Sequence, residues 1–481
     1  MKITLTLTLS LILNSVISQT NPGLAFGGNG NDKGITLCLT NDGGYILAGT
    51  TRSFGAGSED FYLIKLNALW QPVWSDIFGG LHQDFVRSII STDDGFIVLG
   101  DVWDGGNQRL GMYMSLIDTE GNEVWDKQFG THMDDRGFSA IETYDGDFVL
   151  LGYSRGFEQS GDIYIVKTDY QGNLIWQNSY GYDRDDYAMG IVENEDGSLM
   201  IIGTKNGFFD DVHANYERHD ADILLLKIDT DGNEIWKKTY GEDGHDFGYS
   251  IEHADDGYYL FGSTQSWGEG SFDMILTKVD NMGEKEWHAT YGGEHYEYGI
   301  SIDKNLDDEL FLLGSTKSFG QENSVDIYLI KTDNLGHEIW SLTIGGEGAD
   351  FGQHVIATND SGCAIIGTTL SYGAGQMDML FVKINKYGEI EQISNTNNTN
   401  INELVIAPNP MHDNGRLIME NNNADDYTLE ICTLAGIVVK KCNLSVLNTR
   451  FRASSLLAGM YVYKLTNNNN RAVLSGKLVI Y

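Results

Sequence analysis

Cysteine and proline are both scarce in this chain. Its 481 residues contain four of each, and the cysteines are Cys38, Cys363, Cys432 and Cys442. None of them forms a C-x-x-C pair, so the sequence gives no support to a zinc or thiol-redox site. Cys432 and Cys442 flank the turn at 433–436 but are offset across it, which disfavours a hairpin disulfide. We therefore expect buried free thiols.

Basic side chains are few relative to acidic ones. The chain has 31 Lys and Arg against 69 Asp and Glu, a formal net charge of −38. Such a charge disfavours a nucleic-acid partner, because phosphates would be repelled. Residues from 401 onward carry 8 basic and 6 acidic side chains, whereas the first 400 residues carry 23 and 63. This step in composition predicts a domain boundary near residue 400.

Long apolar runs are absent except at the N-terminus. Lys2 is followed by a run of Ile, Leu and Thr that ends in Val16-Ile17-Ser18, with small residues at the spacing that a signal peptidase reads. A membrane anchor is the alternative, but the run is short for a span and rich in threonine. We expect residues 1–18 to be a secretory signal, Gln19 the mature start, and the protein to be exported and soluble, without a transmembrane span.

Glycine and aromatic residues, in contrast, are abundant and follow a repeat of about 50 residues. Each copy has the pattern of four short strands joined by tight turns, which is typical of a β-propeller blade. We predict an all-β, seven-bladed propeller over residues 19–393, and we expect a monomer. A solenoid of sheets is the alternative, but it would carry distinct capping repeats, and none is visible. The copies end near Trp74, Trp125, Trp176, Trp236, Trp287, Trp340 and Glu391.

Two segments compete for the outer strand of the last blade. Residues 22–26 occupy the last-strand position ahead of the first copy, and residues 389–394 occupy it after the seventh. The sequence does not decide between them. Within five copies, Asp-Gly between apolar runs predicts the first hairpin, with a type I′ turn that needs positive φ. These pairs are Asp42-Gly43, Asp94-Gly95, Asp145-Gly146, Asp196-Gly197 and Asp256-Gly257.

One acidic residue recurs six positions after the aromatic residue of each FGG or YGG element. A ring of carboxylates that holds cations is one interpretation, with Ca²⁺ as the possible ion and no other cofactor evident. A metal, however, needs several oxygens that converge on one point, whereas these residues are spread around a wheel. We favour a structural role, in which each residue accepts backbone N–H bonds in the loop that enters the innermost strand. The seven are Asp32, Asp84, Asp135, Asp186, Asp246, Glu297 and Asp350.

An Asp and a Lys recur five residues apart on the third strand of six copies. At that spacing they point to opposite faces and lie about 16 Å apart, so each needs a partner elsewhere, for example in an adjacent blade. The second copy has Gly111 and Leu116 instead. We expect a packing role, because catalysis rarely needs six equivalent copies. The pairs are Asp60/Lys65, Asp162/Lys167, Asp222/Lys227, Asp273/Lys278, Asp326/Lys331 and Asp378/Lys383.

The recurring D-x-x-G-x-x-x-W pattern, with Asp or Asn first, resembles the tryptophan-docking repeat of quinoprotein dehydrogenases. It is more loosely similar to the Asp-box hairpin of sialidases. Both families are propellers, so the resemblance implies the fold. It does not imply their chemistry, because the vicinal cysteines of the first family and the arginine triad of the second have no counterpart here.

We expect function where the copies differ. The fourth copy has an insertion of about nine residues within 206–222, in the loop between its second and third strands. This insertion and two histidines of nearby loops form a candidate face for Ca²⁺, a glycan or a surface protein; the alternative is an exposed, solvated loop. A secreted glycan lyase or hydrolase is the competing function, and it would need paired carboxylates or a His–acid pair with perturbed pKa values. The candidates are Asp210, Asp211, His213, Glu217, His219, Asp220, His245 and His295.

The last eighty residues form a separate unit. Residues 394–402 are an Asn-rich linker, and residues 403–481 alternate short strands and turns, which predicts a small β-sandwich. Three motifs follow in order: Pro408-Asn409-Pro410, the element Leu456-x-x-Gly459-x-Tyr461, and the terminal SGKLVI that contains Lys477. They resemble the type A C-terminal sorting domain of the type IX secretion system of Bacteroidota.

That resemblance implies a partner and a route. The domain would engage the type IX secretion machinery after Sec export, and the protein would reach the outer cell surface or the medium. In that family the domain is commonly removed, and cleavage here would fall at about residues 394–403. The cargo is then anchored to an anionic lipopolysaccharide or released.

Overall fold

The computed structural model describes residues 22–104, 109–157, 161–207, 221–320 and 324–391, together with seven strands between residues 404 and 480. The chain divides into two compact units, Met1–Ile393 and Ser394–Tyr481. In these described ranges the regular structure is all β-strand, and no helix is long and apolar enough to span a membrane. The predicted signal at 1–18 and the linker at 394–402 lie outside the described residues.

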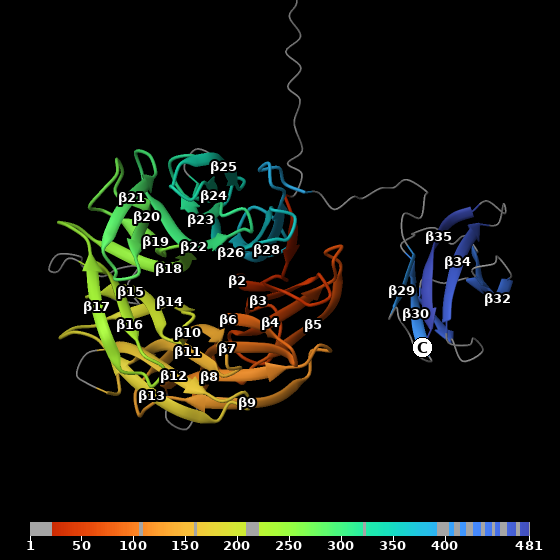
Figure 1. Ribbon diagram of the computed structural model, residues 1–481, viewed down its shortest axis with the longest axis horizontal. Helices are drawn as coiled ribbons and strands as arrows, with labels where there is room; N and C mark the ends of the chain where they lie inside the picture. Colours follow the sequence, from red (N-terminus) through yellow and green to blue (C-terminus); the bar gives the residue numbers. More distant parts are fainter. Residues whose placement is uncertain are drawn as a thin grey trace, which may run out of the picture. The chain divides into compact units, whose positions relative to one another are not determined.

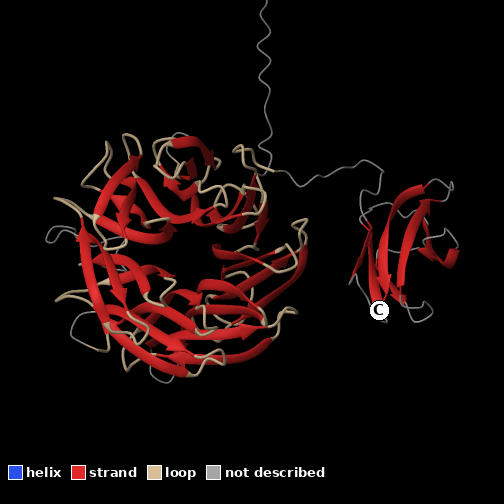
Figure 2. Ribbon diagram, viewed as in Figure 1, coloured by secondary structure: helices blue, strands red, loops and turns tan. Residues whose placement is uncertain are grey.

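The first unit is a ring of seven four-stranded antiparallel sheets, which confirms the predicted propeller (Figures 1 and 2). The first strand of each sheet faces the centre of the ring, and the fourth lies at its rim (Figure 1). Blade 1 contains β2 (Asp32–Leu39), β3 (Tyr45–Thr51), β4 (Asp60–Leu66) and β5 (Pro72–Phe78). Blade 2 contains β6 (Asp84–Thr92), β7 (Gly95–Asp104), β8 (Arg109–Ile117) and β9 (Glu123–Phe129). Blade 3 contains β10 (Asp135–Glu142), β11 (Phe148–Ser154), β12 (Asp162–Thr168) and β13 (Leu174–Tyr180).

The remaining blades repeat this order. Blade 4 contains β14 (Tyr187–Glu193), β15 (Leu199–Lys205), β16 (Asp222–Ile228) and β17 (Glu234–Tyr240). Blade 5 contains β18 (Asp246–Ala254), β19 (Gly257–Thr264), β20 (Asp273–Asp280) and β21 (Lys285–Tyr291). Blade 6 contains β22 (Glu297–Lys304), β23 (Leu310–Thr316), β24 (Asp326–Thr332) and β25 (Glu338–Ile344). Blade 7 contains β26 (Asp350–Ala357), β27 (Cys363–Thr369), β28 (Asp378–Ile384) and, as its outer strand, β1 (Leu24–Phe26).

The core of the ring lies between the blades. The middle strands β3, β11, β23 and β27 are buried along their whole length, because each sheet is covered on both faces by its neighbours. One cluster joins Phe311 and Leu313 of blade 6 to Ile365 and Leu380 of blade 7. Burying each such side chain contributes about 1.5–3 kcal/mol. Outer strands such as β5 contain only exposed and partly buried residues.

The antiparallel order gives the ring two different ends. Loops between second and third strands meet the segment that enters the next blade, as where the Ser58 N–H donates to the His82 carbonyl (3.3 Å) and the Ser271 N–H to the His295 carbonyl (3.1 Å). We call this end the loop-bearing face. The turns between first and second strands and between third and fourth strands lie at the other end, which we call the turn face.

The first hairpins form where the sequence predicts them, but with a different turn. Gly43 has φ of 79°, and its N–H donates to the Thr40 carbonyl at 2.8 Å, while Thr40 N–H donates to Gly44. This is an i→i+3 turn with Asn41 and Asp42 at its centre and a left-handed glycine as its last residue, and not a type I′ turn centred on Asp-Gly. In blade 2, Thr92 pairs directly with Gly95, so Asp93 and Asp94 form the centre of the turn and the glycine ends it.

The recurrent tryptophans connect each blade to the next. Trp74 of blade 1 lies against Gly121 in the third-to-fourth-strand turn of blade 2, where an added Cβ would come within 3.2 Å of the indole. The indole N–H also donates to the Thr119 carbonyl of that turn, at 3.0 Å. A side chain at the glycine would therefore displace the ring. The other pairs are Trp125–Gly172, Trp176–Gly232, Trp236–Gly283, Trp287–Gly336 and Trp340–Gly388.

At the seam between blades 7 and 1 this arrangement is reversed. Glu391 stands at the tryptophan position of blade 7, and Trp70 stands at the glycine position of blade 1, with φ of 60°. The Trp70 ring, like Leu24 and Phe26 of β1, packs against the buried cluster that contains Phe381, and its centroid lies 6.4 Å from that of Phe381. The aromatic ring that covers the seam thus comes from blade 1 instead of blade 7.

Both terminal segments contribute to closure. Residues Leu24–Phe26 pair with Met379–Phe381 of β28, so the N-terminal segment forms the outer strand. Beyond it, Ile390 bridges to Ile384, and the Glu391 N–H donates to the Lys383 carbonyl at 2.8 Å. The C-terminal segment of the propeller therefore occupies the start of the same strand position.

The second unit contains two antiparallel sheets. One has the order β29-β30-β33 and the other β32-β31-β34-β35; their packing as a sandwich stays a prediction. Cys432 pairs with Val438 and Cys442 with Leu429, so the two cysteines are offset, as expected. In the propeller, Cys38 and Cys363 are free. The bounds are β29 (Leu404–Ala407), β30 (Asn414–Met419), β31 (Tyr427–Thr433), β32 (Val438–Leu444), β33 (Asn448–Arg452), β34 (Gly459–Asn467) and β35 (Ala472–Ile480).

Candidate ligand-binding sites

The recurrent acids of the first strands bind the backbone that enters each blade. Asp32 Oδ2 accepts the Gly28 N–H at 2.7 Å, and its oxygens also accept the hydroxyls of Thr51 and Ser53 at the end of β3. In the other six copies, too, the carboxylate accepts a hydrogen bond from the backbone N–H of the residue four positions before it. All seven acids are buried. These contacts support the structural role for Asp32, Asp84, Asp135, Asp186, Asp246, Glu297 and Asp350.

The third-strand acids approach the same segments from the preceding blade. A Cβ added to Gly79 would lie 2.1 Å from Asp60 Oδ1 and 2.9 Å from Asp84 Oδ2, so only glycine fits between the two carboxylates. Burial, aided by the negative charge of Asp84, raises the pKa of Asp60. The first glycine of the FGG element is therefore required by close packing of two acids at the blade junction.

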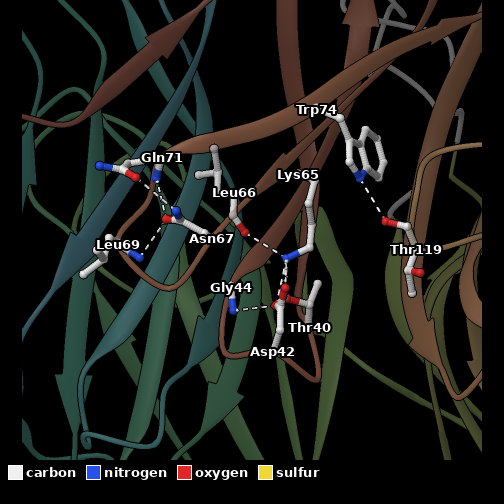
Figure 3. Close-up of polar contacts among 10 residues, drawn as sticks. All are labelled: Thr40, Asp42, Gly44, Lys65, Leu66, Asn67, Leu69, Gln71, Trp74 and Thr119. Atoms are coloured by element: carbon white, nitrogen blue, oxygen red, sulfur yellow. Dashed lines mark hydrogen bonds and ion pairs between the residues drawn. The ribbon is translucent and has the colours of Figure 1, made fainter. Parts of the chain in front are cut away.

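The recurrent lysines close the first hairpin of their own blade. Lys65 Nζ donates to Asp42 Oδ1 at 2.8 Å and to the Thr40 hydroxyl and the Leu66 carbonyl, both at 2.9 Å (Figure 3). We call this contact the lysine lock. The expectation that Lys65 finds its partner in an adjacent blade is wrong, because its carboxylate partner, Asp42, belongs to the same blade. The third strand, which contains Lys65, runs beside the turn between the first two strands. Locks of the same kind join Lys278 to Asp256, Lys331 to Glu309 and Lys383 to Asp360.

The lysine lock is relaxed in blades 3 and 4. Lys167 Nζ lies 3.3 Å from Asp145 and 3.4 Å from Asp147, and its side chain is 13% exposed, against 4–6% for the four tight locks. For Lys227, no ion pair within 4.0 Å is found among the described residues; hydrogen bonds from Ser198 and the more distant Lys227 charge lower the pKa of Asp196. The turn aspartate of blade 4, Asp196, instead accepts from Ser198. The two neighbouring blades therefore share a departure from the common pattern.

The tight locks give a testable asymmetry. Asp42→Ala leaves the buried Lys65 ammonium without its carboxylate, and we expect a loss of about 2 kcal/mol in the free energy of unfolding. Lys65→Leu should cost less, because the Asp42 carboxylate it leaves behind is largely exposed and blade 2 already has Leu116 there. The double variant should therefore recover part of the loss. Urea denaturation of the three variants measures the coupling; strict additivity would contradict the lock.

The loop-bearing face holds two of the predicted candidates. His245 Nδ1 accepts the Ala221 N–H at 3.2 Å, and its ring stacks on Phe247 with centroids 6.2 Å apart. His295 is exposed, and its N–H donates to the Ser318 hydroxyl at 3.0 Å. The two histidines lie on the segments that enter blades 5 and 6. Asp210, Asp211, His213, Glu217, His219 and Asp220 lie outside the described residues.

A pocket of about 250 Å³ opens on the turn face between blades 3 and 4. Its wall comes from the first turns of both blades, from Lys167 and from Thr230, over the apolar side chains of Val149 and Leu199. The recurrent motifs do not mark this site, because Asp145 and Asp196 are the regular turn aspartates of their copies. The signal available in the sequence was Tyr144, an aromatic residue at a turn position where the other copies have Asn, Asp, Glu or Leu.

Charge in this pocket is predominantly negative. Asp145, Glu193, Glu195 and Asp196 face it, with Lys167 as the cation among its wall residues. Glu193 accepts the Tyr144 N–H at 2.7 Å, and burial together with the Asp145 charge raises its pKa. Within the described ranges, no three Asp, Glu, His or Cys side chains are grouped so that they hold a metal ion. The acids of the pocket are therefore spread along its wall instead of converging on one point.

The sorting-motif residues are placed only in part. Gly459 and Tyr461 lie in β34 and Lys477 in β35; Tyr461 is buried and pairs with Leu478. Pro408, Asn409, Pro410 and Leu456 lie outside the described residues. The described motif residues thus lie in the last two strands of the second unit.

The first unit is a seven-bladed β-propeller, and comparison with known families identifies the second. Residues 405–481 match the family of the secretion system C-terminal sorting domain. This match bears out the resemblance to the type IX sorting domain. The chain is therefore a propeller protein with a type IX sorting domain, which indicates export to the cell surface or secretion.

Solved structures similar to the chain are distant from it. The extracellular domain of the putative one component system BT4673 from B. thetaiotaomicron is 11% identical with a TM-score of 0.43; the match covers 96% of this chain and 60% of that protein. PorZ of the type IX secretion system of Porphyromonas gingivalis is 11% identical (TM-score 0.39; 92% and 59% covered). The β-propeller domain of the Trilobed protease from Pyrococcus furiosus is 9% identical (TM-score 0.45; 77% and 98% covered). No curated protein matches the chain.

Proposed function

We propose that the propeller is a binding or scaffold module that recognises a surface protein or a glycan outside the cell. The observation that carries this proposal is that the recurrent polar side chains have structural contacts, whereas the variable ones do not share them. Those that recur, such as Asp32 and Lys65, bond to backbone and to one another inside the fold. The side chains left for a ligand are those in which the blades differ.

Two regions meet this condition. One is the loop-bearing face of blades 4 to 6, with the insertion at 206–222 and the candidates His245 and His295. The other is the pocket between blades 3 and 4 on the turn face. We also propose that residues 1–18 act as a secretory signal and that the sorting domain is removed within 394–403, as in other type IX cargo.

Binding is tested with the full chain, immobilised and exposed to a glycan array, to Ca²⁺ and to proteins extracted from the cell surface. We expect saturable binding of one class of ligand. Deletion of 208–219 tests the loop-bearing face, since unchanged binding excludes the insertion as the site. Turnover of a glycan without saturable retention of any ligand would contradict a binding module and favour the enzyme.

A further inference from the structure

The pocket between blades 3 and 4 coincides with the place where the repeated architecture is relaxed. Blades 1, 5, 6 and 7 hold their lysine with a close carboxylate. In blade 3 the contacts of Lys167 are longer, 3.3 Å to Asp145 and 3.4 Å to Asp147, and in blade 4 no ion pair of Lys227 is found among the described residues. The turns of these two blades form the two sides of the pocket. Because Lys167 is held more loosely than the lysines of the tight locks, the carboxylates at this cavity are less closely neutralised and can attract a ligand.

The charged side chains of the pocket wall determine which sign of charge a ligand should carry. The wall has four carboxylates and one ammonium, so a cation is attracted and an anion is repelled. Glu193 is the most enclosed of the four acids; its neighbours Glu195 and Asp196 are exposed. Its Oε2 atom accepts the neutral Tyr144 N–H at 2.7 Å. Lys167, which is paired with Asp145 and Asp147, attracts Glu193 without forming an ion pair with it.

The spacing of the four acids along the pocket wall determines which shape of cation fits. A metal ion needs oxygens that converge, and no such group exists among the described residues. A planar guanidinium instead carries five N–H donors on a wide fork and forms paired hydrogen bonds with separated carboxylates. Tyr144, which is 75% exposed at the rim, offers an aromatic face on which a guanidinium can lie.

We propose that this pocket binds an arginine side chain presented by a partner protein, with Glu193 and Asp145 as its carboxylate acceptors and Tyr144 as its stacking surface. The proposal rests on the proposed function as a binding module and names the chemical group that the module recognises. The apolar floor of Val149 and Leu199 suits the aliphatic part of that side chain.

The test uses the full chain and agmatine, a guanidinium on an aliphatic stem, in calorimetric titration at low salt. We expect Glu193→Gln to weaken binding by at least about tenfold, since a charge-assisted hydrogen-bond partner is lost. Tyr144→Phe should retain binding and Tyr144→Ala should weaken it. Glu142→Gln is the matched control. Glu142 lies beside Asp93 and Asp94 at the junction of blades 2 and 3, as Glu193 lies beside Asp145 at the next junction. Burial and the charges of Asp93 and Asp94 raise the pKa of Glu142 too.

The variant Lys167→Leu tests independently whether the ligand is positively charged. Leucine at this position is tolerated in blade 2 as Leu116, so the fold should be kept. Removing the competing ammonium should tighten agmatine binding if the ligand is a cation. Weaker binding in this variant, or equal binding of agmatine by wild type and Glu193→Gln, would overturn the proposal.

The same titration distinguishes a guanidinium group of a protein from an amino group of a sugar. A short Arg-containing peptide should bind at least as tightly as agmatine, whereas glucosamine should bind more weakly; preference for glucosamine would overturn the arginine assignment. If agmatine fails to bind while the array still captures a glycan or protein, the pocket proposal is wrong and the binding module stands. If neither binds, the proposed function itself is wrong.

Discussion

Replacing Trp70 with glycine is expected to lower the free energy of unfolding by about 2–3 kcal/mol, because the seam between blades 7 and 1 loses its aromatic cover. Relief of the positive φ at this position offsets only about 1 kcal/mol of that loss. Adding Glu391→Trp should restore much of the stability, since it recreates the tryptophan–glycine contact of the six other junctions. Differential scanning calorimetry of the single and double variants measures the effect.

The design has an internal reference. Trp74→Ala removes a regular docking tryptophan and should destabilise by a similar amount, but Glu391→Trp should not rescue it. If Glu391→Trp has the same effect in wild type and in Trp70→Gly, the reversed arrangement at the seam is not a substitute for the regular one.

Acid is expected to weaken the same seam through His354. Nδ1 of this residue in β26 accepts the Leu37 N–H of β2 at 3.3 Å, a contact that joins blade 7 to blade 1. Burial lowers the pKa of His354 from its ordinary value to about 4. The neutral ring is favoured in the folded state, so its contribution is fully present above the unfolded pKa of about 6.5. It is lost as the pH falls from there towards 4.

The effect is measured as the difference between wild type and His354→Gln. The glutamine oxygen still accepts the Leu37 N–H but does not titrate in this range. After allowance for partial exposure, wild type should lose about 2 kcal/mol more than the variant between pH 7 and pH 4. Parallel stability–pH curves for the two proteins would show that His354 makes no such contribution.

Sequence reasoning reached the fold because the propeller repeats its signals seven times. The interval between tryptophans and the hairpin glycines predicted both the number and the order of the strands. The seam was the part it did not resolve, because closure depends on pairing between distant residues such as Leu24 and Phe381, which are 357 positions apart. Trp70 nevertheless marked the seam in the sequence: it occupies a glycine position in the one copy that follows the missing tryptophan of blade 7.

The candidate sites were predictable to a smaller extent. The insertion at 206–222 stands out by length and charge, and it lies outside the described residues. The pocket between blades 3 and 4 consists of ordinary turn residues, and the feature that distinguishes it is a distance, the lengthened contact of Lys167 with Asp145. The sequence shows Lys167 and Lys227 as regular members of the repeat. Only side-chain geometry separates them from Lys65.

The central claim is that repeated polar residues serve the ring and that departures from the repeat serve the ligand. It is tested most directly by measuring the melting temperature and the agmatine affinity of Asp42→Ala and Glu193→Gln side by side. We predict that Asp42→Ala lowers the melting temperature by several degrees with unchanged affinity, and that Glu193→Gln weakens affinity at an unchanged melting temperature. A parallel loss of both properties in both variants would contradict the claim.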